Sequence, residues 1–296
     1  TDARRSERTR ADFLANASHE LRTPLASLSG FIETLRGHAK DDPGARDKFL
    51  GIMLAQAERM SRLIDDLMSL SRIELNEHIA PLGRVDLAMA AVDVIDALAP
   101  QARDKQVAFD PVLPPRGGAV VDGDRDQIIQ VIQNLVDNAI KYTPKGGTVR
   151  VEIFPGLSAE AAAAPRDPAA ARMSLLTPDH DTTERYAALR VTDRGPGLAR
   201  EHLPRLTERF YRVEGQKSGD RSGTGLGLAI VKHIMNRHRG GLTVESVQGE
   251  GATFGDYLPM AKPRAEIATT VERMLALVND LLDMEKLDAG AMPFDF

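Results

Sequence analysis

The chain has 296 residues, of which 42% are hydrophobic and 27% charged, and this length and composition fit about two globular domains. Its formal net charge of -5 implies no basic surface for nucleic acid. It contains no cysteine, which excludes disulfides, thiolate metal sites and cysteine nucleophiles. No uninterrupted apolar stretch approaches the ~18 residues that a membrane span requires.

The first expected element is an amphipathic helix over residues 12–35. Its apolar residues recur at heptad spacing and are Leu14, Ala17, Leu21, Leu28 and Leu35, with Leu25 and Ile32 beside them. Pro43 and Gly44 break the pattern, and a second helix follows with a seam of Leu50, Met53, Ala57, Met60, Ile64 and Leu67. Residues 1–80 are therefore predicted to form an antiparallel helical hairpin. One hairpin cannot bury this seam alone, so we expect a second copy to complete a four-helix bundle.

Beyond Pro81 the sequence predicts both strands and helices, in a mixed order. Helices are expected at 87–102, 124–142 and 225–238, and strands at 107–109, 119–122, 148–154, 187–193, 242–246 and 253–258. The whole chain is thus predicted to be α+β, with a two-layer α/β sandwich over residues 81–262 after the hairpin. Residues 155–185 are biased toward alanine, proline and charge, which predicts a flexible insertion.

The segment ANASHELRTPL, residues 15–25, places His19 away from the hairpin seam. With Leu14 at heptad position a, His19 falls at position f and Thr23 lies one turn further on the same face. A solvated surface histidine would explain this position. Glu20, however, can accept an imidazole proton as a general base, and Pro24 should bend the helix just after this turn. His19 is therefore a candidate nucleophile.

A polar stripe on the predicted helix 124–142 is a candidate phosphate site. Asn134, Asn138 and Lys141 recur at spacings of four and three beside the buried face. Amide oxygens suit Mg²⁺, and an ammonium group suits phosphate. A solvated helix face explains the stripe equally well.

Two glycine-rich segments are further candidates. In DRGPGL, residues 193–198, Asp193 at a strand end can accept a hydrogen bond from an exocyclic amine such as that of adenine, although a plain turn is the alternative. SGTGLGLAIVKHI, residues 222–234, opens a helix whose free N–H groups favour phosphate, with a simple loop-to-helix turn as the alternative. Between them, TERFYRVEGQKSGDRS reads as a lid with Phe210 and Tyr211 as its latch.

In combination these segments resemble the sequence boxes of sensor histidine kinases of two-component systems. SHELRTP is similar to the H box, NLVDNAIKY to the N box, DRGPGL to the G1 box, ERFYR to the F box and GTGLGL to the G2 box. GATFGDYLP resembles the closing strand, and all occur in family order across residues 11–262. The resemblance implies a dimerisation and histidine-phosphotransfer hairpin followed by a Bergerat-type ATP-binding domain. The hairpin is also similar to that of the phosphate-regulon sensor kinases.

The resemblance implies a role for individual residues. His19 would be the phosphoacceptor, Glu20 its activating base, and Thr23 the residue that orients a water for dephosphorylation of the response regulator. Asn134 and Asn138 would hold Mg²⁺. The full set implied at the nucleotide is Asn134, Asn138, Lys141, Tyr142, Asp193, Gly195, Gly197, Gly223, Thr224, Gly225, Leu226, Gly227 and Thr253. Within it, Lys141 and Tyr142 would contact phosphate or ribose, and Asp193 would bind the adenine amino group.

The implied activity is autophosphorylation of His19 by ATP with Mg²⁺, followed by transfer to an aspartate of a response regulator receiver domain and by regulator phosphatase activity. The implied partners are a second copy and the regulator, with no nucleic acid. A membrane sensor region is expected in the full-length protein, which makes this the cytoplasmic portion of a bacterial inner-membrane protein. An ATPase of the same nucleotide fold, which would lack the H box, and a catalytically silent dimerisation scaffold are the alternatives.

The end of the chain, residues 263–296, is not explained by this resemblance. VERMLALVNDLL, residues 271–282, repeats the apolar pattern of AERMSRLIDDLM, residues 57–68. A seam of this kind predicts a helical partner, and we expect one helix over 266–288 without a catalytic residue of its own. An ordinary capping helix on the ATP-binding domain is the alternative.

Overall fold

The computed structural model describes residues 2–179, 183–213, 223–262, 274–275 and 278. The chain divides into two compact units, Thr1–Met260 and Ala261–Phe296. The helix predicted over 266–288 lies outside the described residues apart from three isolated positions. Among the helices that are described, none combines the length and the apolar character needed to cross a membrane.

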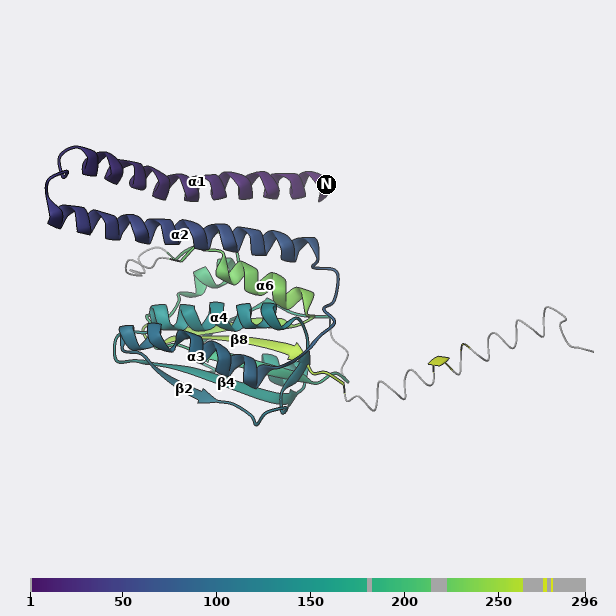
Figure 1. The fold of residues 1–296 in the computed structure, drawn as a ribbon. Helices are drawn as coiled ribbons and strands as arrows, with labels where there is room; N and C mark the ends of the chain where they lie inside the picture. Colours follow the sequence, from purple (N-terminus) through teal and green to yellow (C-terminus); the bar gives the residue numbers. More distant parts are fainter. Residues whose placement is uncertain (1, 180–182, 214–222, 263–273, 276–277, 279–296) are drawn as a thin grey trace, which may run out of the picture. The chain divides into compact units, whose positions relative to one another are not determined.

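The hairpin consists of helices α1 (Asp2–Arg36) and α2 (Pro43–Leu75), which lie side by side and antiparallel (Figure 1). Asp42 caps α2 by accepting a hydrogen bond from the backbone N–H of Ala45, and Pro43 occupies the first turn, where no backbone donor is needed. Helix α1 continues through Pro24. The predicted hairpin is thus present, with α1 beginning earlier than the periodicity indicated.

The predicted seam of the hairpin is only partly buried. Ala17 is buried, whereas the side chain of Leu14 is 64% exposed. The other large apolar side chains exposed on the hairpin are Leu25, Ile32, Leu50, Leu54, Ile64, Met68 and Leu75. A second copy that covers this surface therefore remains our prediction.

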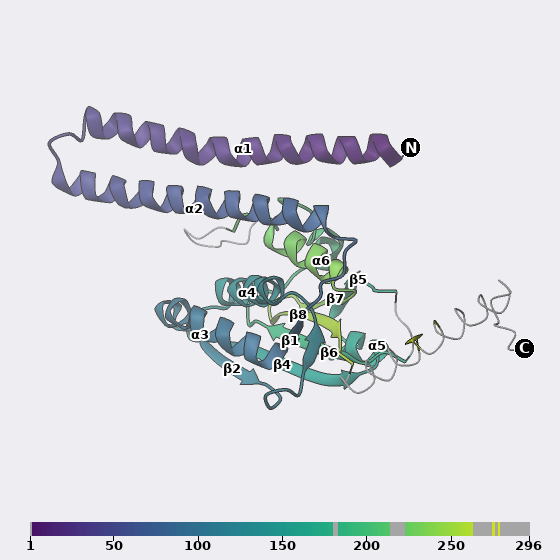
Figure 2. The same ribbon diagram turned by 45° about the vertical axis from the view of Figure 1, so that its right-hand side comes forward.

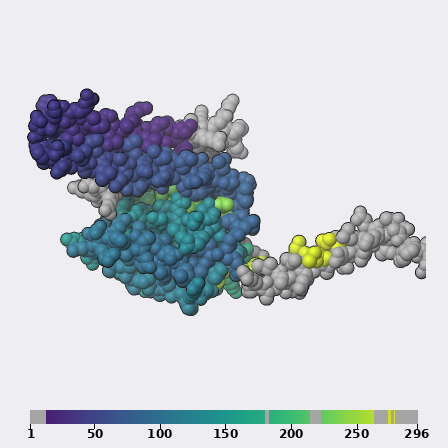
Figure 3. Space-filling view, viewed as in Figure 1, coloured from purple at the N-terminus to yellow at the C-terminus, as the bar shows by residue number. Residues whose placement is uncertain are grey.

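A different face of α2 is fully buried. Leu63, Leu70 and Ile73 belong to the main apolar core together with Ile230 and Ile234 of helix α6 (Gly227–Arg237). Helix α2 packs on α6, and the space-filling view shows α2 directly against the sandwich (Figure 3). The heptad pattern did not indicate this second contact face, because Leu63 and Leu70 lie beside the predicted seam.

The sandwich is built from one six-stranded sheet, a two-stranded ribbon and a layer of helices. In chain order its further elements are β1 (Arg84–Asp86), α3 (Leu87–Lys105), β2 (Ala108–Val112), β3 (Val120–Asp122), α4 (Arg125–Tyr142), β4 (Thr148–Leu157), α5 (Ala159–Ala163), β5 (Ala171–Leu176), β6 (Tyr186–Thr192), η1 (Arg200–Arg205), β7 (Gly241–Val247) and β8 (Gly251–Pro259). The sheet order is β2-β4-β6-β8-β7-β5, and β1 pairs with β3. Among the described strands of this sheet, only the β2–β4 pair is parallel.

Helices α3, α4 and α6 cover one face of the large sheet (Figure 2). The apolar stripe of α4 faces the core, as its 3.6-residue period predicts, and includes Ile128, Ile132 and Leu135. Asp124 starts this helix by accepting from the N–H groups of Asp126 and Gln127. One side of α4 is thereby fixed on the sheet, which leaves its polar stripe facing away from the strands.

The expectation of a flexible insertion over 155–185 is wrong over most of its length. Strand β4 continues to Leu157, and the segment then forms α5 and the edge strand β5, which pairs with β7. Alanine-rich composition suggested a linker, but Ala159 and Ala162 are buried against Tyr186 and Tyr257 on the uncovered face of the sheet. Small side chains fit this shallow contact, and alanine also favours the helix.

Hydrogen bonds and an ion pair from Arg166 to two glutamates also hold the described part of the segment 155–185 in place. The backbone N–H of Arg166 donates to both carboxylate oxygens of Glu245, at 3.1 Å each. Its guanidinium group pairs with Glu152, which is only 2% exposed. A buried carboxylate needs such a partner, and this requirement was not visible in the composition of the segment.

Asp256 is the least expected residue of the core. It lies on β8, is 3% exposed, and its Oδ1 atom has no hydrogen-bond partner within the described structure. Burial raises the pKa of its carboxyl to about 7, although backbone N–H groups at Asp256 and Leu189 oppose the rise. Folding therefore favours the protonated form of this group.

We expect the stability of the fold to fall as pH rises from about 4, the pKa of an unfolded aspartate, to about 7. Between these values the folded chain binds more protons at Asp256 than the unfolded chain does. Asp256→Asn should flatten this dependence and raise the free energy of unfolding at pH 8, measured by chemical denaturation. Glu250→Gln, in the exposed turn before β8, is the matched control. Equal pH slopes for wild type and Asp256→Asn would contradict the assignment.

Candidate nucleotide and histidine site

A cavity of about 1260 Å³ lies between α4, the ends of β6 and β8, the glycine loop before α6, and α2. It brings together most of the residues predicted to contact a nucleotide. Those that line it are Asn134, Asn138, Lys141, Tyr142, Asp193, Gly197, Gly223, Thr224, Gly225 and Gly227. Segments that are distant in the sequence are therefore adjacent here.

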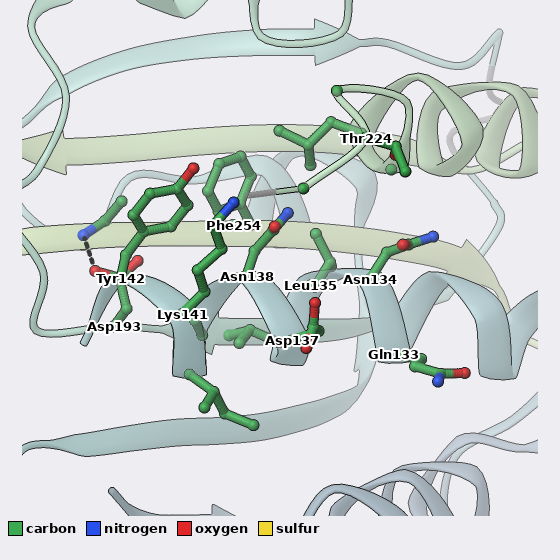
Figure 4. Close-up of a pocket in the computed structure, with 18 of the residues that line it drawn as sticks. Gln133, Asn134, Leu135, Asp137, Asn138, Lys141, Tyr142, Asp193, Thr224 and Phe254 are labelled. Atoms are coloured by element: carbon green, nitrogen blue, oxygen red, sulfur yellow. Dashed lines mark hydrogen bonds between the residues drawn. The ribbon is translucent and has the colours of Figure 1, made fainter. Parts of the chain in front are cut away.

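The polar stripe of α4 forms the floor of this cavity. Asn134, Asn138 and Lys141 rise from the helix toward the glycine loop at Thr224 (Figure 4). Burial lowers the pKa of the Lys141 ammonium group, so a bound anion would compensate a charge that is costly to desolvate. Lys105 fixes the end of α4 by donating to the carbonyl of Ile140 at 2.7 Å and to that of Lys141.

The glycines of the loop keep a gap above this floor. A Cβ atom on Gly223 would lie 3.2 Å from Nζ of Lys141, and one on Gly227 would lie 3.0 Å from Oδ1 of Asn134. Larger residues would fill the space between the loop and the polar side chains. The cradle has the donors and the room that phosphate groups need.

Asp193 lies where β6 ends and is 7% exposed. Its Oδ1 atom accepts from the backbone N–H of Gly195 at 2.7 Å and of Ala252 at 3.3 Å. Burial raises the pKa of this carboxyl to about 6, and these two hydrogen bonds oppose the rise. The carboxylate keeps further acceptor capacity for a ligand donor.

Two glycines have backbone conformations that other residues rarely adopt. Gly197 has φ +68, and a Cβ there would collide with the carbonyl group of Val247. Gly225 has φ +76, with the Cα atom of Phe210 2.9 Å from its Cβ position. The N–H of Phe210, itself at φ 64, donates to the carbonyl of Gly225 at 2.8 Å. The described part of the predicted lid, residues 207–213, is therefore joined directly to the glycine loop, whereas residues 214–222 of that prediction lie outside the described residues.

An apolar pocket adjoins Asp193, and the sequence motifs did not indicate it. Its side chains are Val191, Leu198, Leu206 and Phe254. A flat ring that donates to Asp193 could lie among them. The alternation in β6 and β8 predicted buried positions, but only the fold shows which of them border a cavity.

Three of the predicted nucleotide residues do not line the cavity. Gly195 contributes through its backbone N–H group, which donates a hydrogen bond to the carboxylate of Asp193. Leu226 is fully buried in the apolar core. The hydroxyl of Thr253 is hydrogen-bonded to that of Thr192 at 2.9 Å. These residues support the walls of the site.

His19 lies at a second cavity of about 830 Å³ between α1 and the lid. Its side chain is exposed, and Glu20 pairs with Arg212 of the lid at 2.9 Å and with Arg59 of α2 at 3.6 Å. Tyr211 and Arg212 line both cavities. This lid segment thus separates His19 from the predicted nucleotide site.

Thr23 lies one turn after His19, as predicted. Its exposed hydroxyl donates to the carbonyl oxygen of His19 at 3.3 Å, and it lines neither cavity. The hydroxyl therefore lies on the same stretch of α1 as the imidazole.

Side chains of the hairpin also line the larger cavity, and sequence reasoning missed them. They are Glu58, Arg62, Asp65 and Asp66 of α2. Asp66 accepts a hydrogen bond from the hydroxyl of Thr224 at 2.5 Å. The heptad pattern assigned this helix to a bundle and gave no reason to expect it at the cavity. In the sequence, the two consecutive acids at 65 and 66 were the feature that could have indicated a polar contact.

Comparison with known proteins agrees with this geometry. Residues 9–76 match the His Kinase A (phospho-acceptor) domain, and residues 123–262 match the histidine kinase-, DNA gyrase B-, and HSP90-like ATPase domain. The chain belongs to the sensor histidine kinases. The expected family and the expected hairpin-plus-sandwich fold are therefore confirmed.

Two relatives of this kinase chain are informative. The phosphate regulon sensor protein PhoR of Pseudomonas aeruginosa is 35% identical over 84% of the chain and 49% of that protein. The sensor-like histidine kinase SenX3 of Mycolicibacterium smegmatis is 34% identical over 86% of the chain and 59% of that protein. The chain thus spans only about half the length of these curated relatives.

A solved structure shares the fold of this kinase chain. It is histidine kinase ThkA in complex with response regulator protein TrrA, with a TM-score of 0.59 and 20% identity. The match covers 87% of the chain and 64% of that chain. The likeness therefore extends over both the hairpin and the sandwich.

We expect Asp193→Asn to weaken the binding of an adenine nucleotide by about 10- to 100-fold, because a charged hydrogen-bond acceptor is lost. For the wild type, affinity should fall as pH drops below about 6, the pKa at which Asp193 gains a proton. Calorimetry with ATP at pH 5.5 and 7.5 measures both effects. Guanine nucleotide, which lacks the amino group at that ring position, is the ligand control. Equal affinity of the two proteins at both pH values would contradict this role.

Proposed function

We propose that this chain uses ATP to phosphorylate His19 and then passes the phosphoryl group to an aspartate of a response regulator receiver domain. One observation carries the proposal. The cavity at His19 and Glu20 and the cavity with the donors for a nucleotide share the lid residues Tyr211 and Arg212 as part of their lining. Movement of that lid would bring the two together.

The chemical step needs a neutral imidazole. One ring nitrogen of His19 attacks the γ-phosphorus, the bond to the β–γ bridging oxygen breaks, and ADP leaves. Glu20 accepts the proton from the other ring nitrogen. Because Glu20 is paired with Arg212 and Arg59, these cations must release the carboxylate before it can act as a base.

The nucleotide cavity fits Mg²⁺-ATP. Asp193 would accept from the adenine amino group, Lys141 would contact phosphate, and Asn134 with Asn138 would hold the metal ion. Amide oxygens and phosphate oxygens are hard ligands that suit Mg²⁺. Mg²⁺ would offset the negative charge of the phosphates.

The proposed partners are a second copy and a response regulator. The exposed apolar seam of the hairpin supports a four-helix bundle with another chain. The complex of ThkA with a response regulator protein supports the second partner. The likeness to PhoR supports a sensor of the phosphate-regulon type, and we propose that the full-length protein adds a membrane sensor region to this cytoplasmic portion.

His19→Gln should abolish acid-labile labelling from γ-labelled ATP, because glutamine offers no nucleophilic ring nitrogen. Affinity for the nucleotide should stay within about twofold, since His19 does not line that cavity. Labelling is followed by gel autoradiography with and without acid treatment. His38→Gln, near the hairpin turn, should label like the wild type. Label that persists in His19→Gln would overturn the assignment, and no label in the wild type would favour the silent scaffold.

Thr23→Ala should impair dephosphorylation of the response regulator by about tenfold and autophosphorylation much less. The reason is that its hydroxyl lies one turn from His19 but outside the nucleotide cavity. Decay of labelled regulator in the presence of each variant measures the first rate. Thr23→Ser, which keeps the hydroxyl, should behave like the wild type. Equal losses of both activities in Thr23→Ala would count against a separate role.

A further inference from the structure

Among the hairpin carboxylates that line the nucleotide cavity, Asp66 is hydrogen-bonded to the glycine loop. Asp66, midway along the second half of α2, accepts a hydrogen bond at 2.5 Å from the hydroxyl of Thr224. Thr224 lies in the glycine loop that is expected to cradle phosphate. The same hydroxyl accepts from the N–H of Leu226 at 3.2 Å, so the contact is tied to the backbone of the loop. An acidic group of α2 is therefore bonded to the loop that should bind an anion.

The negative charge around Asp66 disfavours the binding of a phosphate group beside it. Burial raises the pKa of this carboxyl, and the charges of Asp65 and Asp137 raise it further, whereas the hydrogen bond from Thr224 and the charge of Arg62 oppose the rise. Like charges within a few ångströms repel strongly when they are partly buried. A triphosphate on the glycine loop would add several negative charges at this place.

Other acids of the hairpin bind the lid and α6 in the same way. Glu20 pairs with Arg212 at 2.9 Å, and Glu74 pairs with Arg209. The carboxylate of Glu77, just after α2, accepts from Asn236 of α6 at 2.6 Å. The hairpin thus holds the loop, the lid and α6 through acidic groups, and Asp66 is the one of these acids that itself lines the nucleotide cavity in the described structure.

We propose that Asp66 is a nucleotide-sensing latch: it holds α2 on the glycine loop when no triphosphate is bound, and bound phosphate displaces it. This inference rests on the proposed function, because it takes the cavity to be an ATP site. Binding energies are reciprocal, so a latch that phosphate opens must also weaken phosphate binding while it is closed. A ligand that has the adenine ring but no phosphate should leave the latch closed.

A cross-linking experiment can follow the latch in the whole chain. Ser69 of α2 and Gln130 of α4 are hydrogen-bonded at 3.0 Å, and the chain has no cysteine, so Ser69→Cys with Gln130→Cys supplies the only two thiols. The rate of cross-linking by a short bismaleimide is measured without ligand, with adenosine and with AMP-PNP. We expect AMP-PNP to slow cross-linking by about fivefold and adenosine to leave it unchanged.

Asp66→Asn in the same background tests the charge. The amide can still accept from Thr224 but does not repel phosphate, so the effect of AMP-PNP should shrink to less than about twofold. Its affinity for AMP-PNP should rise by about fivefold and its affinity for adenosine should stay constant. Asp47→Asn, an exposed acid near the start of α2, is the matched control and should keep the full response.

The outcomes separate this inference from the proposed function. If calorimetry shows that AMP-PNP binds but cross-linking in the wild-type background is unchanged, the latch is wrong and the kinase proposal stands. A full response in Asp66→Asn would also overturn the latch. If AMP-PNP does not bind at all, the proposed nucleotide site fails, and the latch fails with it.

Discussion

One apolar face of the second half of α2 packs against the sandwich. The same face cannot also pack against a second hairpin. Leu63, Leu70 and Ile73 lie in one core with α6. This packing sets how far α1 is from the glycine loop, which side of the lid His19 faces, and which acids reach the nucleotide cavity. Ile64 and Met68 remain exposed on another side of the helix. Docking on the sandwich therefore still leaves apolar surface for a second hairpin.

Local patterns in the sequence predicted those parts of the site that one element supplies by itself. The 4-3 spacing of Asn134, Asn138 and Lys141 placed them on one face of α4, and the position of Asp193 after a hydrophobic run placed it at a strand end. Asp66 could not be predicted, because it enters the cavity only through the packing of α2 on α6. The ordered insertion was missed for a similar reason, since Ala159 and Arg166 depend on partners from distant strands.

Opposite charges join the lid and the hairpin. The lid carries Arg209 and Arg212, which pair with Glu74 near the end of α2 and with Glu20 in the middle of α1. Phosphate groups would compete for the same cations, and guanidinium groups bind phosphate as readily as carboxylate. The carboxylate expected to act as a base for His19 is also the one that pairs with the lid. Availability of the base and closure of the lid are therefore linked through one side chain.

The balance of energies favours partial over complete release of α2. Three fully buried aliphatic side chains contribute roughly 1.5–3 kcal/mol each, whereas a partly exposed ion pair contributes about 0–1 kcal/mol. A ligand at about 1,000 times its Kd supplies about 4 kcal/mol, which exceeds the polar contacts but not the whole apolar face. Leu70 and Ile73 lie near the end of α2, next to the connection into β1, while Asp66 lies further from that connection. Nucleotide can therefore separate the part of α2 around Asp66 and Ser69 while Ile73 stays packed as a hinge, so that the lid and His19 move without exposing the whole core.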